Sequence, residues 1–158
     1  MTEFTHLDHT GAAHMVDVSS REVTERVSTA RGRVLLAPAT VAMIRDAKVP
    51  KGDVLSTARL AGIMAAKRTA DLIPLCHPIA ITYADVALAV EDWGVAISAD
   101  VRIKDRTGVE MEALTAVSIA GLTIIDMVKS VDPAAVLTDI SVATKSGGRS
   151  GEWRNPNG

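Results

Sequence analysis

The chain has 158 residues, of which 47% are hydrophobic and 23% are charged, and its 17 basic and 19 acidic side chains give a formal net charge of -2. This composition excludes a disordered tail protein, because such chains lack the apolar surface that offsets the entropy of ordering. It also argues against nucleic-acid binding, which relies on many uncompensated positive charges. The aromatic residues are only Phe4, Tyr83, Trp93 and Trp153, so we expect no base-stacking surface and a core of smaller side chains.

The first half of the chain predicts one or two strands followed by two helices. Residues 13–19 are expected to be a short extended segment. Residues 22–36 are rich in β-forming side chains, and the break at Arg31-Gly32-Arg33 predicts either a strand pair or one bulged strand. Pro38 fits the first turn of a helix that runs to about residue 47. Asp53 is the expected N-cap of a second helix over about residues 54–70, whose small side chains should let another element approach closely.

The second half predicts a hairpin, a long helix and a last strand. An apolar loop at residues 72–78 precedes two segments, 79–91 and 95–104, that alternate in period two, which predicts a β-hairpin. Apolar residues at helical spacing predict the longest helix over about residues 111–131. Residues 136–143 are expected to form a strand, followed by a basic, glycine-rich loop at 145–151. Together these elements predict an α+β fold with three helices on one side of an antiparallel sheet.

No break in composition divides the chain, so we expect a single domain over residues 1–158. A flexible leader (about 1–12) and a flexible tail (about 150–158) are expected at its ends. The longest uncharged stretches, 113–125 and 72–84, are shorter than the roughly 18 apolar residues that a bilayer requires, so no membrane partner is expected. A single cysteine and a polar N-terminus favour the cytoplasm.

Two basic segments are candidate anion sites. The loop that contains Lys145 and Arg149 could turn its glycine amides toward a phosphate, although it lacks the order of residues of a nucleotide-hydrolysing P-loop. A solvated surface loop explains the same residues equally well. Lys51, which stands just before the second helix, could also hold an anion near the helix N-terminus, and a simple turn with a surface lysine is the alternative.

The long helix carries charged residues at both of its ends. Asp126 and Lys129 are three residues apart and therefore share a face, either as a surface ion pair or as a proton donor and acceptor in a pocket. Glu110 and Glu112 begin the helix, where carboxylates interact favourably with its dipole. On one straight helix, Glu112 and Asp126 lie about 21 Å apart along the axis. A small reactive centre therefore cannot contact both within one chain, and either a long ligand or a second chain must connect them.

Histidines and the cysteine give weaker signals. Cys76 and His77 are adjacent, and adjacent side chains point apart in an extended segment, so they do not form a catalytic dyad. His77 remains a candidate general acid or base. His6 and His9 lack a second pair of ligands, so we expect no metal site.

Longer motifs make the sequence specific. The resemblance that these motifs carry extends over nearly the whole chain, from about residue 4 to 151. In chain order, the motifs are Met15-Val16-Asp17-Val18-Ser19, Lys51-Gly52-Asp53-Val54-Leu55, residues 58–67, Leu72-Ile73-Pro74-Leu75-Cys76-His77-Pro78, residues 107–117, Asp126-Met127 with Lys129, and Lys145-Ser146-Gly147-Gly148. Together they resemble the cyclic pyranopterin monophosphate synthase family of molybdenum cofactor biosynthesis.

The resemblance implies a ferredoxin-like α+β fold, assembled as a homohexamer of three dimers with active sites at the dimer interface. The implied substrate is a small molecule, the 3′,8-cyclised dihydro-GTP, which is rearranged to a pyranopterin with a cyclic phosphate while diphosphate leaves. No cofactor is required by the sequence, and Mg²⁺ is left open as a companion of the triphosphate. The rival interpretation is a non-catalytic oligomeric protein that binds nucleotides or regulates another process.

The resemblance also implies roles for individual residues. The expected catalytic residues are Asp126, Lys129 and Lys51, with Asp126 and Lys129 as the central acid/base pair. The expected substrate-binding residues are Leu75, Cys76, His77, Glu110, Met111 and Glu112 around the pterin and ribose, with Lys67, Lys145, Arg26 and Arg149 toward the phosphates. Ile125, Val128 and Arg149 depart from the residues common in the family, and we expect the first two to alter packing only.

Overall fold

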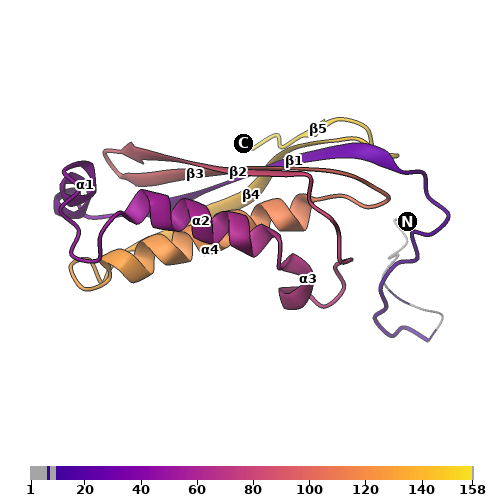
Figure 1. The fold of residues 1–158 in the computed structure, drawn as a ribbon, viewed down its shortest axis with the longest axis horizontal. Helices are drawn as coiled ribbons and strands as arrows, with labels where there is room; N and C mark the ends of the chain where they lie inside the picture. The colour runs from indigo at the N-terminus through magenta and orange to yellow at the C-terminus, as the bar shows by residue number, and fades with distance from the viewer. Residues whose placement is uncertain (1–6, 8–9, 158) are drawn as a thin grey trace.

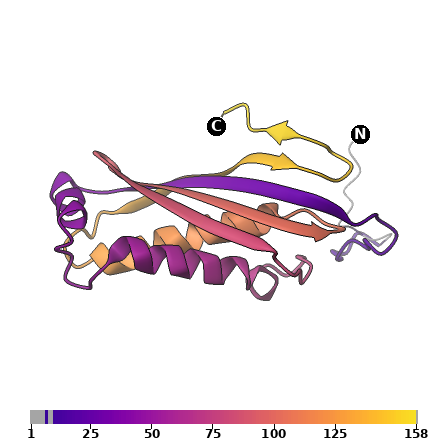
Figure 2. The same cartoon turned by 45° about the horizontal axis from the view of Figure 1, so that its top comes forward.

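The computed structural model describes residue 7 and residues 10–157, which form a five-stranded antiparallel sheet with helices packed on one of its faces (Figures 1 and 2). The sheet order is β2-β3-β1-β4-β5. In chain order the elements are β1 (Thr24–Leu35), α1 (Pro38–Arg45), α2 (Val54–Ala66), α3 (Thr69–Leu72), β2 (Tyr83–Glu91), β3 (Gly94–Asp105), α4 (Glu110–Val128), β4 (Val136–Ser146) and β5 (Trp153–Arg154). The predicted α+β class, with helices on one sheet face, is confirmed.

β1 is one continuous strand, which settles the choice that the sequence left open. It pairs with β3 along its whole length, and its register with β4 shifts between Thr29 and Ala30 and again between Arg31 and Arg33. Between these arginines, a β-carbon on Gly32 would lie 2.6 Å from Cγ1 of Val117 in α4. Glycine is therefore needed where the long helix crosses the bulged strand.

The predicted second helix divides into α2 and α3. Its start is as expected, because the Asp53 side chain accepts a hydrogen bond from the backbone amide of Ser56 at 2.9 Å. The helix ends early because Arg68 has a non-helical φ of -116°. The buried Thr69 hydroxyl donates to the Ala66 carbonyl at 3.0 Å, at the junction of the two helices. The predicted end near residue 70 was therefore wrong, and the short α3 turns the chain toward the apolar loop.

α2 and α4 lie side by side under the sheet and make the principal helix contact of the fold (Figure 1). The expectation of close approach is confirmed at Gly62, where a β-carbon would lie 2.9 Å from the Ala116 carbonyl oxygen and 3.3 Å from Cβ of Ala120. The core is aliphatic throughout, since the described aromatic residues Tyr83, Trp93 and Trp153 are all exposed. α4 is apolar and long enough to cross a membrane, contrary to expectation, but 56% of its most apolar stretch is buried in the fold, as in core helices.

We expect the replacement Gly62→Val to lower the free energy of unfolding by about 1–3 kcal/mol, because the new methyl groups overpack the α2–α4 contact. The measurement is a urea unfolding curve at equal protein concentration. Arg59→Val on the exposed side of α2 is the matched control, since it introduces the same β-branched residue without the clash. Equal free energies of unfolding for the two variants would show that the close approach of α2 and α4 at Gly62 does not require glycine for stability.

The C-terminal part of the chain is more regular than expected. β4 continues to Ser146 and therefore includes Lys145, which the sequence placed in a loop. β5 lies within the segment expected to be a tail and pairs with β4 at Thr144 and Lys145. The Asn155 amide also donates to the Ala143 carbonyl at 2.8 Å. Backbone pairing therefore holds residues 153–155 against the sheet edge.

Candidate functional site

The polar residues expected to be functional gather in two places, one at each end of α4. We call Lys51, Asp126 and Lys129 the lysine cluster, which lies at the C-terminal end of the helix. The second place is a cavity of about 300 Å³ at the N-terminal end, which we call the ring cavity. Since α4 is a single continuous helix, its rise separates Glu112 from Asp126 by about 21 Å along the axis.

In the lysine cluster, two ammonium groups hold one carboxylate. Lys129 Nζ lies 2.7 Å from Oδ1 of Asp126, and Lys51 Nζ lies 3.0 Å from Oδ2. Lys51 also donates to the Asp126 backbone carbonyl at 2.7 Å, which fixes the loop before α2 against the end of α4. The hydrogen bonds from Lys129 and then Lys51 lower the pKa of Asp126, so the carboxylate is ionised at neutral pH. All three side chains are exposed to solvent and can reach a ligand.

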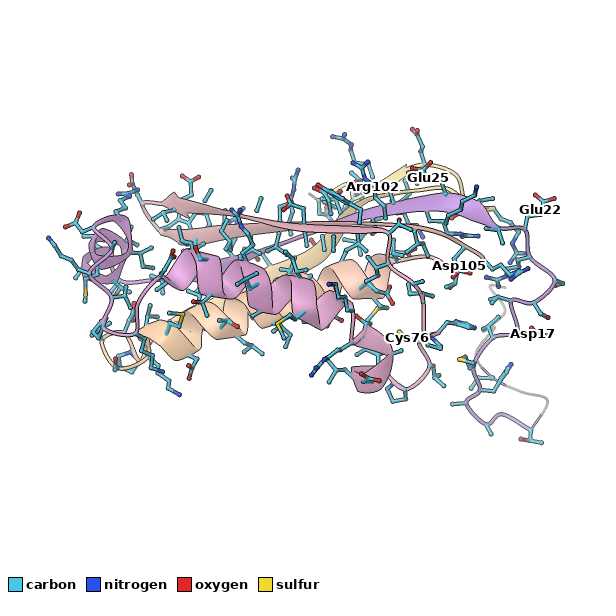
Figure 3. The ribbon with its side chains drawn as sticks, in the orientation of Figure 1. Asp17, Glu22, Glu25, Cys76, Arg102 and Asp105 are labelled. Atoms are coloured by element: carbon cyan, nitrogen blue, oxygen red, sulfur yellow. The ribbon has the colours of Figure 1, made fainter. Side chains whose placement is uncertain are left out.

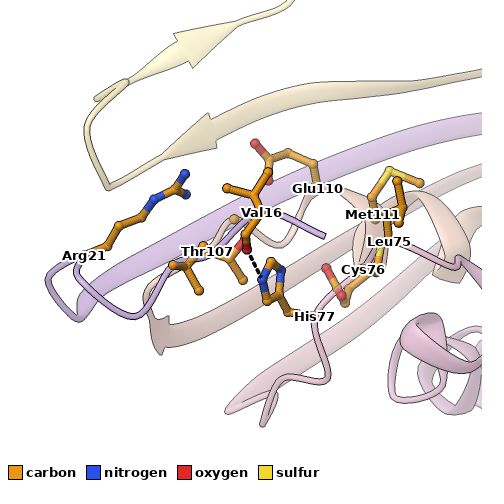
Figure 4. A pocket seen from close by; sticks show the side chains of 11 residues that line it. Val16, Arg21, Leu75, Cys76, His77, Thr107, Glu110 and Met111 are labelled. Carbon is orange, nitrogen blue, oxygen red and sulfur yellow. Dashed lines mark hydrogen bonds between the residues drawn. The ribbon is translucent and has the colours of Figure 1, made fainter. Parts of the chain in front are cut away.

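The ring cavity is built from three segments that are far apart in the sequence (Figure 4). Val16, Val18 and Arg21 come from the segment before β1, and Leu75, Cys76 and His77 come from the apolar loop after α3. Thr107 and Gly108 belong to the turn before α4, and Glu110, Met111 and Glu112 belong to its first turn. Figure 3 shows Cys76 on the helical side of the sheet, whereas Arg102 and Glu25 project from the opposite face.

Glu112 is the most buried acid of the ring cavity. Its side chain is 4% exposed, and burial raises its pKa from the usual 4.5 to about 7, with a further contribution from the nearby negative charge of Glu110. Burial, together with the charge of Glu112, raises the pKa of the Cys76 thiol, so this thiol is not activated as a nucleophile. Glu112 can therefore exchange a proton near neutral pH, and Cys76 lines the wall.

The His77 ring is held by the segment before β1. Nε2 of His77 lies 2.8 Å from the Val16 backbone carbonyl oxygen, drawn as the dashed line in Figure 4. A carbonyl oxygen can only accept, so Nε2 carries a hydrogen, and in the neutral ring Nδ1 is the nitrogen that can accept a hydrogen bond. This contact joins residues 61 positions apart and fixes the tautomer of the ring.

The cationic residues expected to face phosphates lie around the ring cavity. Lys145 reaches the ring cavity only through Glu110, with 3.0 Å between its Nζ and Oε1 of Glu110, and it lines a separate cavity of about 490 Å³ with Thr144, Ser146 and Trp153. Arg26 and Arg149 line a neighbouring cavity of about 510 Å³, and Arg26 donates to the backbone carbonyls of Asp105 and Arg106, each at 3.1 Å. Lys67 lines a third cavity of about 370 Å³, which shares His77 and Glu112 with the ring cavity. Lys67 therefore shares a cavity with His77 and Glu112, whereas Arg26 and Arg149 line the cavity next to theirs.

Sequence reasoning missed Arg21. Its side chain lines both the ring cavity and the cavity of Arg26 and Arg149, so it stands where the two spaces meet. The only sequence signal for Arg21 was its position as a basic residue two places after Ser19, the last residue of the first motif that resembles the family. His6 and His9, considered as half a metal site, lie outside the described residues. Within residues 7 and 10–157, no group of three His, Cys, Asp or Glu side chains is placed to hold a metal ion.

Comparisons with known proteins agree with this arrangement of motifs. A model described as the MoaC family matches residues 15–148. A cyclic pyranopterin monophosphate synthase of Streptomyces griseus subsp. griseus is 61% identical over 150 residues, which cover 95% of this chain and 85% of the relative. One from Nocardioides sp. is 60% identical, covering 96% and 95%. A cyclic pyranopterin monophosphate synthase 2 of Mycobacterium bovis is 55% identical, covering 96% and 90%.

Proposed function

The chain belongs to the MoaC family, and from this premise we propose that it is the lyase of molybdenum cofactor biosynthesis that its relatives' names describe. It converts the 3′,8-cyclised dihydro-GTP to cyclic pyranopterin monophosphate and releases diphosphate. The observation that carries the proposal is that every motif residue expected to act belongs to the lysine cluster, lines the ring cavity or one of the two cavities that share residues with it, or, in the case of Lys145, pairs with Glu110 of the ring cavity. A simple nucleotide-binding protein would need the cations but not the acids and the histidine among them.

The lysine cluster supplies acid–base chemistry. Asp126 is ionised between two ammonium groups, so it accepts a proton or stabilises positive charge, while Lys129 and Lys51 are the proton donors beside it. Opening the guanine five-membered ring and closing a new ring require several proton transfers at one place. A carboxylate that contacts two ammonium groups can pass protons between them without a large movement.

The ring cavity holds the pterin and ribose. His77 and Glu112 offer hydrogen-bond partners, of which Glu112 changes protonation near neutral pH, and Leu75 and Met111 provide apolar contact with the rings. Glu110 and Cys76 complete the wall. The phosphates extend toward Lys67, Lys145, Arg26 and Arg149, whose positive charge stabilises the departing diphosphate.

The active site is formed by two chains. One chain keeps the lysine cluster and the ring cavity about 21 Å apart, so the lysine cluster of one subunit acts on a substrate held by its partner. The helical layer offers a surface for this contact, because Leu60, Met64 and Leu122 are 62%, 57% and 52% exposed. Such apolar side chains on an uncovered helical layer are typical of a protein interface. The assembly is a homohexamer of three dimers, and the protein works in the cytoplasm.

No resident cofactor takes part. The chain's own cations neutralise the triphosphate, and the only metal considered is Mg²⁺ as an optional companion of the substrate. Nucleic acid and membranes are not partners of this enzyme.

The test is incubation of the purified protein with the cyclised substrate, followed by measurement of diphosphate and of the pyranopterin product. We expect both to form in equal amounts. Binding of the substrate without release of diphosphate would contradict the proposal and favour a non-catalytic nucleotide-binding protein.

A further inference from the structure

The turn before α4 places Gly108 directly against the carboxylate of Glu110. A β-carbon built on Gly108 would overlap Oε2 of Glu110 and would lie 2.8 Å from its Cδ. The Glu110 carboxylate that this β-carbon would meet is the end of a flexible side chain, so it can move away. The backbone of Gly108 is not in the left-handed region that favours glycine, so other residues can adopt its conformation. An alanine at position 108 would therefore displace the carboxylate while leaving the turn intact.

The position of this carboxylate matters because it holds a lysine. Oε1 of Glu110 accepts a hydrogen bond from Nζ of Lys145 at 3.0 Å, and this pair joins the first turn of α4 to the end of β4. The Glu110 and Lys145 side chains are only 31% and 33% exposed, so solvent screens the pair less than a surface ion pair. Displacing the carboxylate would therefore release the ammonium group from a defined place at the edge of the ring cavity.

We propose that Gly108 is a positioning residue of the synthase reaction. Because Gly108 has no side chain, Glu110 folds back over the turn and holds Lys145 beside the wall of the ring cavity. The proposal rests on the proposed function for its link to catalysis, but the contact among Gly108, Glu110 and Lys145 is a property of the fold. Gly108 acts through the other two residues and does not itself react.

A double-mutant cycle tests the proposal. We expect Gly108→Ala to lower kcat/KM about tenfold, mainly by raising KM, since one charge-assisted contact to the substrate is lost. In the Glu110→Ala background, Gly108→Ala should cause no further loss, because no carboxylate remains to be displaced. Equal losses in both backgrounds would overturn the proposal. So would unfolding of the double variant, because that would mean that position 108 needs glycine for the backbone itself.

A second readout does not depend on activity. The rate at which acetic anhydride acylates Lys145, measured by mass spectrometry and normalised to the exposed Lys104 of β3, reports whether Glu110 still contacts the amine. We expect the rate to rise by the same factor in Gly108→Ala and in Glu110→Ala. An unchanged rate in Gly108→Ala would overturn the proposal. If the wild-type protein fails to turn over the cyclised substrate while both variants show the raised rate, the proposed function fails and the positioning of Lys145 by Gly108 stands.

Discussion

Replacing Asp126 by asparagine should abolish formation of the pyranopterin, with a loss of at least about a hundredfold in kcat. Asparagine keeps the shape of the side chain but has no charge, so it cannot accept a proton from Lys51 or Lys129, whose ammonium groups lie 3.0 and 2.7 Å from the carboxylate, and it binds them only through a neutral hydrogen-bond acceptor. Lys129→Ala should have a similar effect, because it removes one of the two proton donors. The measurement is single-turnover product formation, together with sedimentation to show that the oligomer survives.

Asp139→Asn is the matched control for the loss of an acidic side chain. Asp139 on β4 also pairs with a cation, Arg33, at 3.5 Å, but it belongs neither to the lysine cluster nor to the lining of the ring cavity. Its variant should keep wild-type activity. Retained activity in Asp126→Asn, or in an assembled Lys129→Ala, would show that the lysine cluster does not carry the proton transfers.

The second large effect concerns Glu112 and depends on pH. Burial raises the pKa of Glu112 from 4.5 to about 7, so between these values the folded chain binds more protons than the unfolded chain. The Glu112 carboxyl therefore lowers the free energy of unfolding as the pH rises from 4.5 to about 7. Above pH 7 its contribution to that free energy no longer changes with pH. Glu112→Gln cannot ionise. We expect its free energy of unfolding, relative to wild type, to increase between pH 4.5 and pH 8 by up to roughly 3 kcal/mol, while activity is lost.

The measurement is a series of urea unfolding curves from pH 4.5 to pH 8 for wild type and variant. Glu91→Gln, at an exposed position at the end of β2, controls for the amide itself and should follow the wild-type curve. A constant difference between Glu112→Gln and wild type across this range would mean that Glu112 titrates alike in the folded and unfolded chains. The ring cavity would then lack its buried proton-exchanging acid.

Much of the fold could be predicted from local sequence. The period-two alternation of residues 79–91 and 95–104 predicted the β2–β3 hairpin, and Asp53 predicted the start of α2. The spacing of Asp126 and Lys129 also predicted their contact, because residues three apart on a helix face the same way. These features depend on neighbours in the sequence, so the sequence alone was sufficient.

The remaining features depend on contacts between distant segments. The buried Thr69 and the non-helical Arg68 separate α2 from α3, although helix propensity continues through both residues. Pairing with β1 extends β4 to Ser146, which a local reading placed in a flexible loop. The place of Arg21 between two cavities depends on how the segment before β1 crosses the turn before α4. No local pattern contains this information, because each contact joins segments that the fold alone brings together.

The most direct test of a shared active site is to mix two inactive variants. Asp126→Asn disables the lysine cluster, and Glu112→Gln disables the ring cavity, so a dimer of one chain of each holds one site with both defects and one intact site. After co-expression in equal amounts, activity should return to about one quarter of the wild-type value, because about half of the dimers are mixed. Activity no higher than that of the separate variants would contradict a shared active site and place the whole site within a single chain.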